Sequence, residues 1–296
     1  MVHKEAEGRA VSHSHQPRQT ERTDFIAVLA KVCLITFLTS LGIVVLYPLF
    51  WMALNGFKTN AEIFGNPFAL PTGLSLTNYI AAWNQGIRNY IATSVTVTLG
   101  SAACTVLVSA WTAYGLTRSK LPGKPFFVGI VLGGLMLSPT VAVIPLVRMM
   151  QDLGLYNTYW ALIILYTAFR IPFTTFLIRA YMLGLPRDLD EAAIMDGASE
   201  GQIFWKVTLP LCKPILVSSV ILHVLFAWNE YLFAMIFTSG ADLQTLPVGL
   251  TSIMAKHGTN YAVVFAAMTL SALPIVMVFF AAQRFFIRGL AEGIGK

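Results

Sequence analysis

Long apolar stretches, separated by short polar segments, dominate the chain from Phe25 onward. Six of them carry almost no charge and reach the length of about 20 residues that a membrane-spanning helix needs. They are Phe25–Leu54, Tyr90–Thr117, Pro125–Val147, Thr158–Ile178, Leu211–Phe237 and Tyr261–Phe286. The strands of a membrane β-barrel would alternate apolar and polar residues with a period of two, which these stretches do not. The pattern therefore predicts an all-α membrane protein with six transmembrane helices.

Two connections between these spans are long enough to fold. Residues 55–89, rich in Gly, Pro and Asn, are expected to form short helical turns against the outer mouth of the bundle, and residues 179–210 form the second connection. Within the third span, Gly133, Gly134 and Pro139 are expected to permit bends and close packing.

The composition fits a single membrane domain. Of the 296 residues 56% are hydrophobic and 11% are charged, against about 45–50% and 25% in ordinary soluble domains, which argues against a soluble enzyme. The domain is predicted to cover residues 25–290, with tails at 1–24 and 291–296. Because the first apolar run is longer than the core of a secretory signal, about 7–15 residues, we expect a disordered tail before an uncleaved first span.

The basic residues predict the orientation. If the amino terminus is inside, the outer segments hold Lys58, Arg88, Arg148 and Lys256, Arg170 lies within the fourth span, and the other Lys and Arg residues are internal. The positive-inside rule then places both termini in the cytoplasm. Since the basic residues are scattered between apolar runs, the net charge of +6 does not indicate a nucleic-acid partner.

The cytoplasmic connection 179–210 carries two consecutive sets of helix signals. Asp188 with Glu191, and Ser199 with Gln202, have the spacing of capping boxes, and Gly197 between them is a helix stop. This pattern predicts a helix-turn-helix that ends near Leu209 and Pro210.

The chemistry of this loop allows two interpretations. Ala192 and Ala193 permit close approach, Glu191 and Asp196 offer carboxylates to basic groups, and Ile203, Phe204 and Val207 recur at helical spacing as an apolar face. Such a loop could dock into a groove on another protein. Alternatively, the same helices could pack beneath their own bundle.

This loop resembles the EAA signature of ABC importer permeases. The matching residues are Glu191-Ala192-Ala193, then Gly197 after three residues, Val207 after nine more, and Leu209-Pro210 after one more. The one departure is Val207, where the signature has Ile. Further short motifs resemble the second, maltose-system-type permease of carbohydrate importers. Among them are Phe57-Lys58-Thr59, Leu70-Pro71, Asn78-Tyr79, Tyr114-Gly115 with Arg118, Gly154-Leu155, Ala227-Trp228-Asn229-Glu230, Thr245-Leu246-Pro247 and Gln283-Arg284-Phe285-Phe286.

This resemblance implies a permease of the bacterial inner membrane that forms a heterodimer with a second permease, above an ATPase dimer and below an extracytoplasmic sugar-binding protein. It also implies that the loop is the coupling element. Glu191 and Asp196 would make polar contacts with the ATPase, Ala192, Ala193 and Gly197 would permit close approach, and Val207, Leu209 and Pro210 would complete the coupling helix. ATP and Mg would bind the partner, because this chain lacks the GxxxxGK[ST] loop and is expected to bind no cofactor itself.

Charged residues at membrane depth are costly and often mark a pathway. Arg170, next to Pro172, lies in the fourth span, and Trp228, Asn229, Glu230 and Tyr231 lie in the fifth. These side chains could line a translocation pathway, with Asn229 and Glu230 binding sugar hydroxyls and Trp228 or Tyr231 stacking on a sugar ring. Alternatively, Arg170 and Glu230 pair with each other or with the second permease.

Other function classes fit less well. A membrane-embedded enzyme would need a nucleophile and base or a metal set such as HExxH, and His223 and His257 have no ligand partner at three or four residues. Cys33, Cys104 and Cys212 are expected to be packing residues. A secondary transporter would show inverted repeats. Within the ABC class, the transported solute is expected to be a mono-, di- or oligosaccharide, with a solute such as glycerol phosphate as the alternative because of Arg170.

Overall fold

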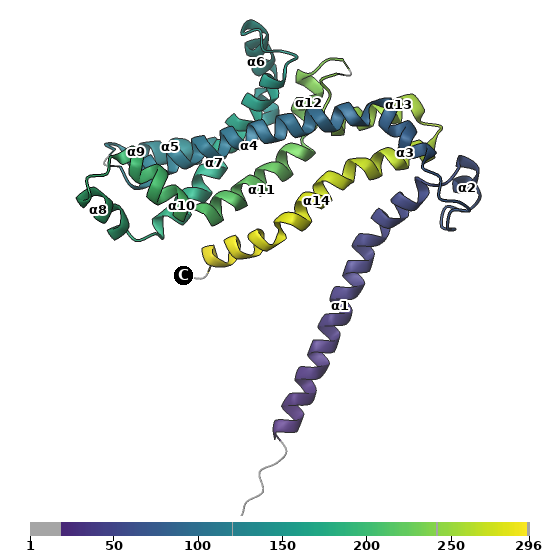
Figure 1. Ribbon diagram of the computed structural model, residues 1–296, viewed down its shortest axis with the longest axis horizontal. Helices are drawn as coiled ribbons and strands as arrows, with labels where there is room; N and C mark the ends of the chain where they lie inside the picture. The colour runs from purple at the N-terminus through teal and green to yellow at the C-terminus, as the bar shows by residue number, and fades with distance from the viewer. Residues whose placement is uncertain (1–18, 120, 241, 295–296) are drawn as a thin grey trace, which may run out of the picture. The chain divides into compact units, whose positions relative to one another are not determined.

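The computed structural model describes residues 19–119, 121–240 and 242–294, and the side chains from Ala27 to Phe280 within them except that of His257. The described residues form helices and no strand (Figure 1), which confirms the predicted all-α class. The helices are α1 (Gln19–Asn55), α2 (Asn60–Gly65), α3 (Thr77–Ala82), α4 (Arg88–Thr117), α5 (Lys124–Gly134), α6 (Pro139–Asp152), α7 (Tyr159–Leu183), α8 (Asp188–Met195), α9 (Glu200–Ile203), α10 (Leu209–Leu211), α11 (Lys213–Asn229), α12 (Leu232–Phe237), α13 (Leu246–His257) and α14 (Tyr261–Ile294). Two π-helical turns, Trp83–Ile87 and Phe204–Thr208, join α3 to α4 and α9 to α10.

The chain divides into two units, residues 1–51 and residues 52–296. The first unit is formed by α1, which begins at Gln19, ahead of the predicted boundary at Phe25. The rest of the predicted tails, residues 1–18 and 295–296, lies outside the described residues. The apolar side chains of α1 between Val28 and Phe50 are exposed, as expected of a helix whose surroundings are apolar.

Four helical segments are long and apolar enough to cross a membrane: Ala27–Asn55, Thr77–Thr117, Tyr159–Leu183 and Tyr261–Phe280. Two further candidates are bent pairs, α5 with α6 at 96° and Glu200–Leu211 with α11 at 76°. The described residues thus provide four spans, or up to six if each bent pair crosses once.

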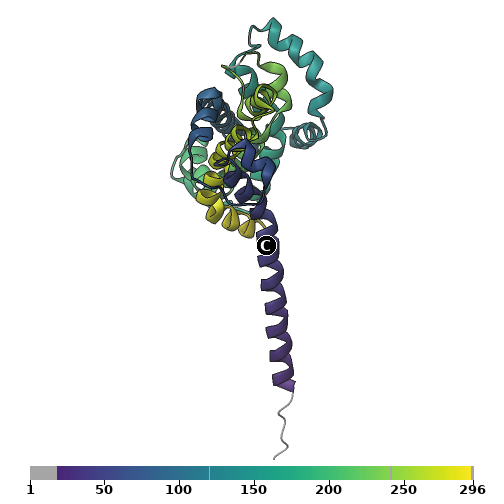
Figure 2. The ribbon, with the colours of Figure 1, turned by 90° about the vertical axis from the view of Figure 1, so that its right-hand side faces the viewer.

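The third predicted span is a broken helix (Figure 2). After Gly134 the backbone tightens into a short turn, in which the Met136 N–H donates to the Gly133 carbonyl at 3.0 Å. Ser138 is then extended, with φ −76° and ψ 124°, as the residue before a proline prefers, and Pro139 starts α6 in a new direction. Gly134 also permits close approach to α7, since a Cβ atom there would lie 2.8 Å from Pro172 Cγ.

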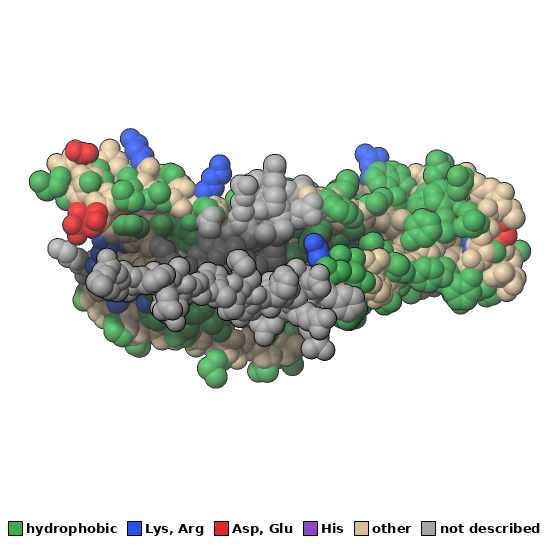
Figure 3. Space-filling view, turned by 90° about the horizontal axis from the view of Figure 1, so that it is seen from below, with side chains coloured by type: hydrophobic (Ala, Val, Ile, Leu, Met, Phe, Trp, Pro, Cys, Tyr) green, Lys and Arg blue, Asp and Glu red, His purple; other side chains and the backbone are tan. Residues whose placement is uncertain are grey.

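The core of the second unit lies between α4, α7 and α11, which pack side by side. The face that α4 buries includes a row of small hydroxyl residues, namely Ser94, Thr98, Ser101, Thr105 and Ser109. Small residues let helix backbones approach closely where there is no water to drive burial. Large apolar residues of α4, such as Leu99 and Trp111, point outward instead, and Figure 3 shows hydrophobic side chains spread over much of one described face.

The external connection has the short helical turns expected of it. The Asn78 amide donates to the Gly56 and Lys58 carbonyls at 3.0 and 2.8 Å, and the Lys58 ammonium donates to the Pro67 carbonyl at 2.9 Å. A capping box of Thr59 and Glu62 begins α2. The Glu62 carboxylate also accepts hydrogen bonds from the backbone and hydroxyl of Thr72. The connection is therefore a folded segment rather than a slack linker.

Acid should unfold this connection only at very low pH. Hydrogen bonds from Thr59 and Thr72 to the carboxylate lower the pKa of Glu62 to about 2. Because the folded pKa is depressed, the stabilisation is present above the unfolded pKa of about 4.3 and is lost as the pH falls through about 2. Amide hydrogen exchange over residues 59–72, corrected for intrinsic exchange, should stay protected at pH 5. In Glu62→Gln the same amides should exchange faster at neutral pH, and equal protection in the two proteins would contradict the assignment.

Candidate functional site

The connection 184–212 is a helix-turn-helix, as its local signals predict. Gly197 has φ +79° and ends α8, with its N–H donating to Ile194 and that of Ala198 donating to Ala193. The left-handed backbone at this position favours glycine. Ser199 and Gln202 form the predicted capping box at the start of α9.

The other predicted capping box is wrong. The N-cap of α8 is Arg187, which makes no side-chain cap bond, and Asp188 is already the first helical residue. The backbone N–H groups of Asp190 and Glu191 donate to the Arg187 carbonyl. The first turn instead holds three acidic residues, Asp188, Asp190 and Glu191. Their negative charges are stabilised by the positive end of the helix dipole.

The helix-turn-helix has one face that packs on its own bundle and one that is exposed. The packing interpretation fits the first face, and the docking interpretation fits the second. Ile203 and Phe204 are buried, and the Phe204 ring packs on Tyr114 of α4 with centroids 5.2 Å apart. This apolar face therefore packs on its own bundle. Glu191, Ala192, Asp196 and Gly197 are exposed and Ala193 is half-buried, while Ile194 and Met195 are 60% and 87% exposed. The surface of α8 and its turn is the one open to a partner.

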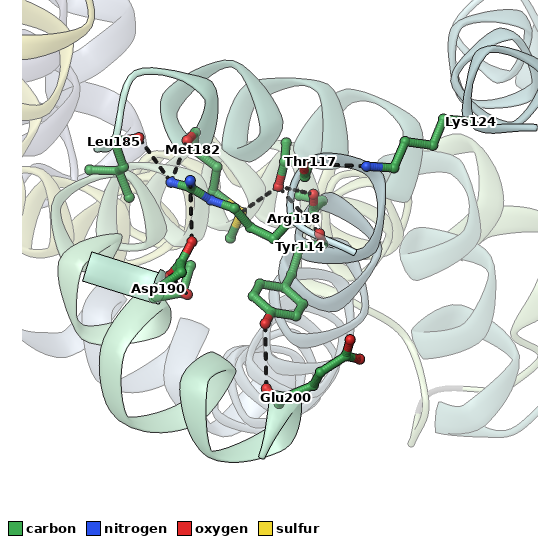
Figure 4. Close-up of polar contacts among 10 residues, drawn as sticks. Tyr114, Thr117, Arg118, Lys124, Met182, Leu185, Asp190 and Glu200 are labelled. Atoms are coloured by element: carbon green, nitrogen blue, oxygen red, sulfur yellow. Dashed lines mark hydrogen bonds and ion pairs between the residues drawn. The ribbon is translucent and has the colours of Figure 1, made fainter. Parts of the chain in front are cut away.

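Arg118, at the end of α4, ties this loop to the long helices (Figure 4). Its Nη1 lies 3.2 Å from Asp190 Oδ2 of α8, and Nη2 donates to the carbonyls of Met182 at 3.1 Å and Leu185 at 3.0 Å. The two charged side chains are only 8% and 17% exposed. One guanidinium thus joins the ends of α4 and α7 to the first turn of α8.

Sequence reasoning missed Asp190. It lies in a run of three acidic residues of which Asp188 and Glu191 are exposed, and it alone is half-buried. The signal in the sequence that could have indicated an acidic partner was Arg118. It follows Tyr114-Gly115 at the end of a long apolar helix, and an arginine buried there requires a partner.

In the fifth predicted span, Glu230 caps a second helix. Between α11 and α12 the backbone at Glu230 is extended, and the carboxylate accepts hydrogen bonds from the N–H groups of Phe233 at 2.9 Å and Ala234 at 3.1 Å. The Tyr166 hydroxyl of α7 donates to the same carboxylate at 2.7 Å. The carboxylate therefore satisfies backbone groups that a helix break would otherwise leave unbonded in the membrane.

Arg170 does not pair with Glu230 among the described residues, so the prediction that these two side chains pair with each other is wrong. Pairing with the second permease stays a prediction. The Arg170 guanidinium carbon lies 4.7 Å from the ring centroids of both Phe173 and Phe226. Arg170 is also one helical turn beyond Tyr166, the residue that does reach Glu230. The guanidinium is held by cation–π contacts and the carboxylate by hydrogen bonds.

The remaining candidates for the pathway are placed differently. Trp228 is 8% exposed and packs in a cluster with Tyr90 and Leu246, so its ring is not free to stack on a solute. Asn229 is exposed and donates to the Leu225 carbonyl, and Tyr231 is 40% exposed.

The structure thus combines apolar helices of spanning length, a polar break in the fifth predicted span, and a surface helix-turn-helix bonded to two long helices. Residues 107–292 match the family described as binding-protein-dependent transport system inner membrane component. The chain belongs to this family, and is the permease subunit of a binding-protein-dependent ABC importer, with several helices in the inner membrane.

Similar proteins agree with this assignment. The chain is 46% identical over 254 residues to "Probable ABC transporter permease protein YurM" of Bacillus subtilis, covering 86% of this chain and 85% of that one. It is 31% identical to the diacetylchitobiose uptake system permease protein NgcG of Streptomyces coelicolor, covering 85% and 84%. In fold it is similar to a chain of a bacterial ABC transporter for alginate import, with a TM-score of 0.78 and 24% identity, covering 92% of this chain and 100% of that one.

Asp190→Asn should loosen the loop without unfolding the bundle. Arg118 keeps its two carbonyl acceptors, so the loss should be about 1.5–3 kcal/mol, as for one hydrogen bond to a charged group. Hydrogen exchange over residues 186–200 should rise, while exchange in α4 and α7 stays unchanged. Asp188→Asn, at an exposed position of the same turn, is the matched control, and equal effects of the two variants would show that the pair with Arg118 is unimportant.

Glu230→Gln should lower the thermal stability of the purified protein, because an amide offers one acceptor oxygen where the carboxylate uses both. Tyr166→Phe removes only the hydroxyl bond to the carboxylate and should cost about 1.5–3 kcal/mol. Melting curves in detergent measure both losses. A Glu230→Gln protein that melts like the wild type but transports a different range of solutes would favour a direct role in solute binding instead.

Proposed function

We propose that the chain is the second, maltose-system-type permease of an ATP-driven importer for sugars, and that α8 with the turn at Gly197 docks into a separate ATPase subunit. The observation that carries the coupling role is the combination of an exposed α8 surface with an anchored first turn. Met195 and Ile194 project from α8, while Asp190, in the same helix, is bonded to Arg118. The proposed docking surface of α8 is exposed, and the first turn of α8 is bonded through Arg118 to the ends of α4 and α7.

The exposed residues suit a groove of mixed character. Ala192 and Gly197 leave the surface low, Ile194 and Met195 supply apolar contact, and Glu191 and Asp196 supply carboxylates for basic groups of the ATPase. The end of the coupling helix lies on the side of the bundle. Its residues are Val207 and Leu209, which are half-buried, and Pro210, which is exposed. They join the loop to α11 across the 76° bend.

Movement of the ATPase would reach the membrane helices through few contacts. A displacement of α8 is transmitted by Arg118 to the ends of α4 and α7, and a displacement of α9 is transmitted by the contact of Phe204 with Tyr114. The Tyr114 hydroxyl also donates to the Glu200 carbonyl at 3.4 Å. Both halves of the loop therefore act on α4, and rocking of this helix against its neighbours would alternate the access of the pathway.

Sugar is the solute that the observations favour. The uptake system of one relative is named for diacetylchitobiose, and the exposed Asn229 and Tyr231 beside the helix break offer an amide and an aromatic ring, groups that bind sugar hydroxyls and sugar faces. The second candidate is a phosphate-bearing solute such as glycerol phosphate. It rests on Arg170, whose buried Nε has no hydrogen-bond partner among the described residues, although its guanidinium faces are covered by Phe173 and Phe226.

The proposal implies the remaining assembly. This permease forms a heterodimer with a second permease and binds an ATPase dimer that holds ATP and Mg. It receives sugar from an extracytoplasmic binding protein and places both termini in the cytoplasm. The chain itself needs no cofactor for this role.

Gly197→Asp should detach the ATPase while leaving the second permease bound. An aspartate at φ +79° is strained and projects from the docking surface. The tagged chain, recovered from native membranes in mild detergent, is compared with the variant by identification of the co-purified subunits. Gly201→Asp is the matched control, because Gly201 is exposed, is near no other group, and has no positive φ.

Recovery of the ATPase with the wild type and with Gly201→Asp, and its loss with Gly197→Asp, would support the docking role. Retention of the ATPase in Gly197→Asp would overturn it. In vesicles made from the same membranes, ATP-dependent uptake of labelled sugars rather than glycerol phosphate distinguishes the two candidate solutes.

A further inference from the structure

Residues 58–87 of the external connection carry only two charged side chains, and Arg88 just beyond them is exposed. Between Thr59 and Ile87 the one charged residue is Glu62, and its carboxylate accepts hydrogen bonds from Thr59 and Thr72. At the start of the connection, Lys58 is 1% exposed and its ammonium donates to the Pro67 carbonyl. The surface of this segment therefore offers no exposed ammonium or guanidinium group and no carboxylate free of internal bonds.

The same segment exposes large apolar side chains. Phe64, Leu70, Leu74, Leu76 and Ile80 are 58–77% exposed. They are not the product of a loose chain, because the Asn78 and Tyr79 side chains hold the segment to the end of α1 through hydrogen bonds to Gly56, Lys58 and Ala53. A folded segment that buries its one ammonium group, bonds its one carboxylate internally and exposes its large apolar groups suits an apolar environment.

The segment is fixed at the outer end of the last span. The Asn60 amide donates to the Thr259 carbonyl at 2.9 Å and accepts from the Ala262 N–H at 3.1 Å, which caps the start of α14. The ring of Phe64 lies edge-on to that of Tyr261, with centroids 5.4 Å apart. Figure 1 shows α2 next to α3, at the end of the second unit from which α14 starts. The segment thus lies at the level where the apolar helices leave the hydrocarbon.

We propose that residues 64–80 form an interfacial membrane anchor, which places Phe64, Leu70, Leu74, Leu76 and Ile80 at the headgroup boundary of the outer leaflet. Exposed Phe and Leu side chains bind at that depth in proportion to the apolar area that they bury there. The exposed apolar surface also continues along the chain into the span Thr77–Thr117, through Ile80 and Trp83.

This anchor is independent of the proposed solute and of the ATPase. It would hold the outer ends of α3 and α14 at a fixed depth, since α2 and α3 both contact α14.

Depth-dependent quenching tests the anchor. In the assembled complex, Cys33, Cys104 and Cys212 are replaced by Ala, and a single cysteine is placed at Leu74 or, in a second variant, at Leu70. Each is labelled with an environment-sensitive fluorophore in vesicles of phosphatidylethanolamine and phosphatidylglycerol. The control label replaces Lys256, an exposed cationic residue of α13. Quenching is measured with nitroxide-bearing lipid and with aqueous iodide.

The anchor predicts that labels at residues 74 and 70 are quenched several-fold more by nitroxide lipid than the label at residue 256, and less by iodide. Iodide quenching equal to that of the control would overturn the proposal by placing the segment in water. Protection from both quenchers would also overturn it, because a protein partner would then cover the segment. If one variant fails to assemble, the other gives the same comparison.

Discussion

The guanidinium of Arg118 is the contact on which the end of the second unit that carries α8 depends. The last carbonyl groups of a helix have no partners within the helix, and here two carbonyls at and after the end of α7 are satisfied by an arginine from the end of α4. Its charge is balanced by Asp190, which belongs to the next helix along the chain. Separating the three helix ends would break the ion pair and both carbonyl bonds of this guanidinium at once.

Beyond this contact, the small residues of α4 face large apolar side chains of its neighbours, such as Leu162 and Tyr166 of α7. The buried stripe of Ser and Thr on α4 brings α7 and α11 close, and within that seam His223 and Ser101 are joined by a 2.8 Å hydrogen bond. A helix with small residues on its inner face has few interlocking side chains to resist sliding. The firm contacts lie at its ends: Arg118 at one, and at the other Ser94, whose hydroxyl accepts from the Leu246 N–H at 2.7 Å.

Local signals were enough to predict part of this structure. Gly197, the Ser199–Gln202 capping box and the break after Gly134 depend on residues close in sequence, and each has the predicted form. The EAA spacing located the loop but did not reveal which of its faces is buried, because that depends on Phe204 meeting Tyr114 of a distant helix. The pair of Arg118 with Asp190 was missed for the same reason. The break at Glu230 has no nearby Pro or Gly to signal it, and the expectation that opposite charges would pair was wrong because helix N–H groups and a tyrosine already occupy the carboxylate.

The break between α5 and α6 restricts where lipid can be. From Leu135 to Ser138 the backbone is not helical, and Met136 and Leu137 are 88% and 68% exposed in this chain. Irregular backbone does not face hydrocarbon, because its N–H and C=O groups would lose their hydrogen bonds. If the bent pair lies at membrane depth, this corner must therefore border another subunit or a water-filled space. The backbone at residues 135–138 is then enough to show that this corner does not face lipid. This conclusion does not depend on which solute is transported.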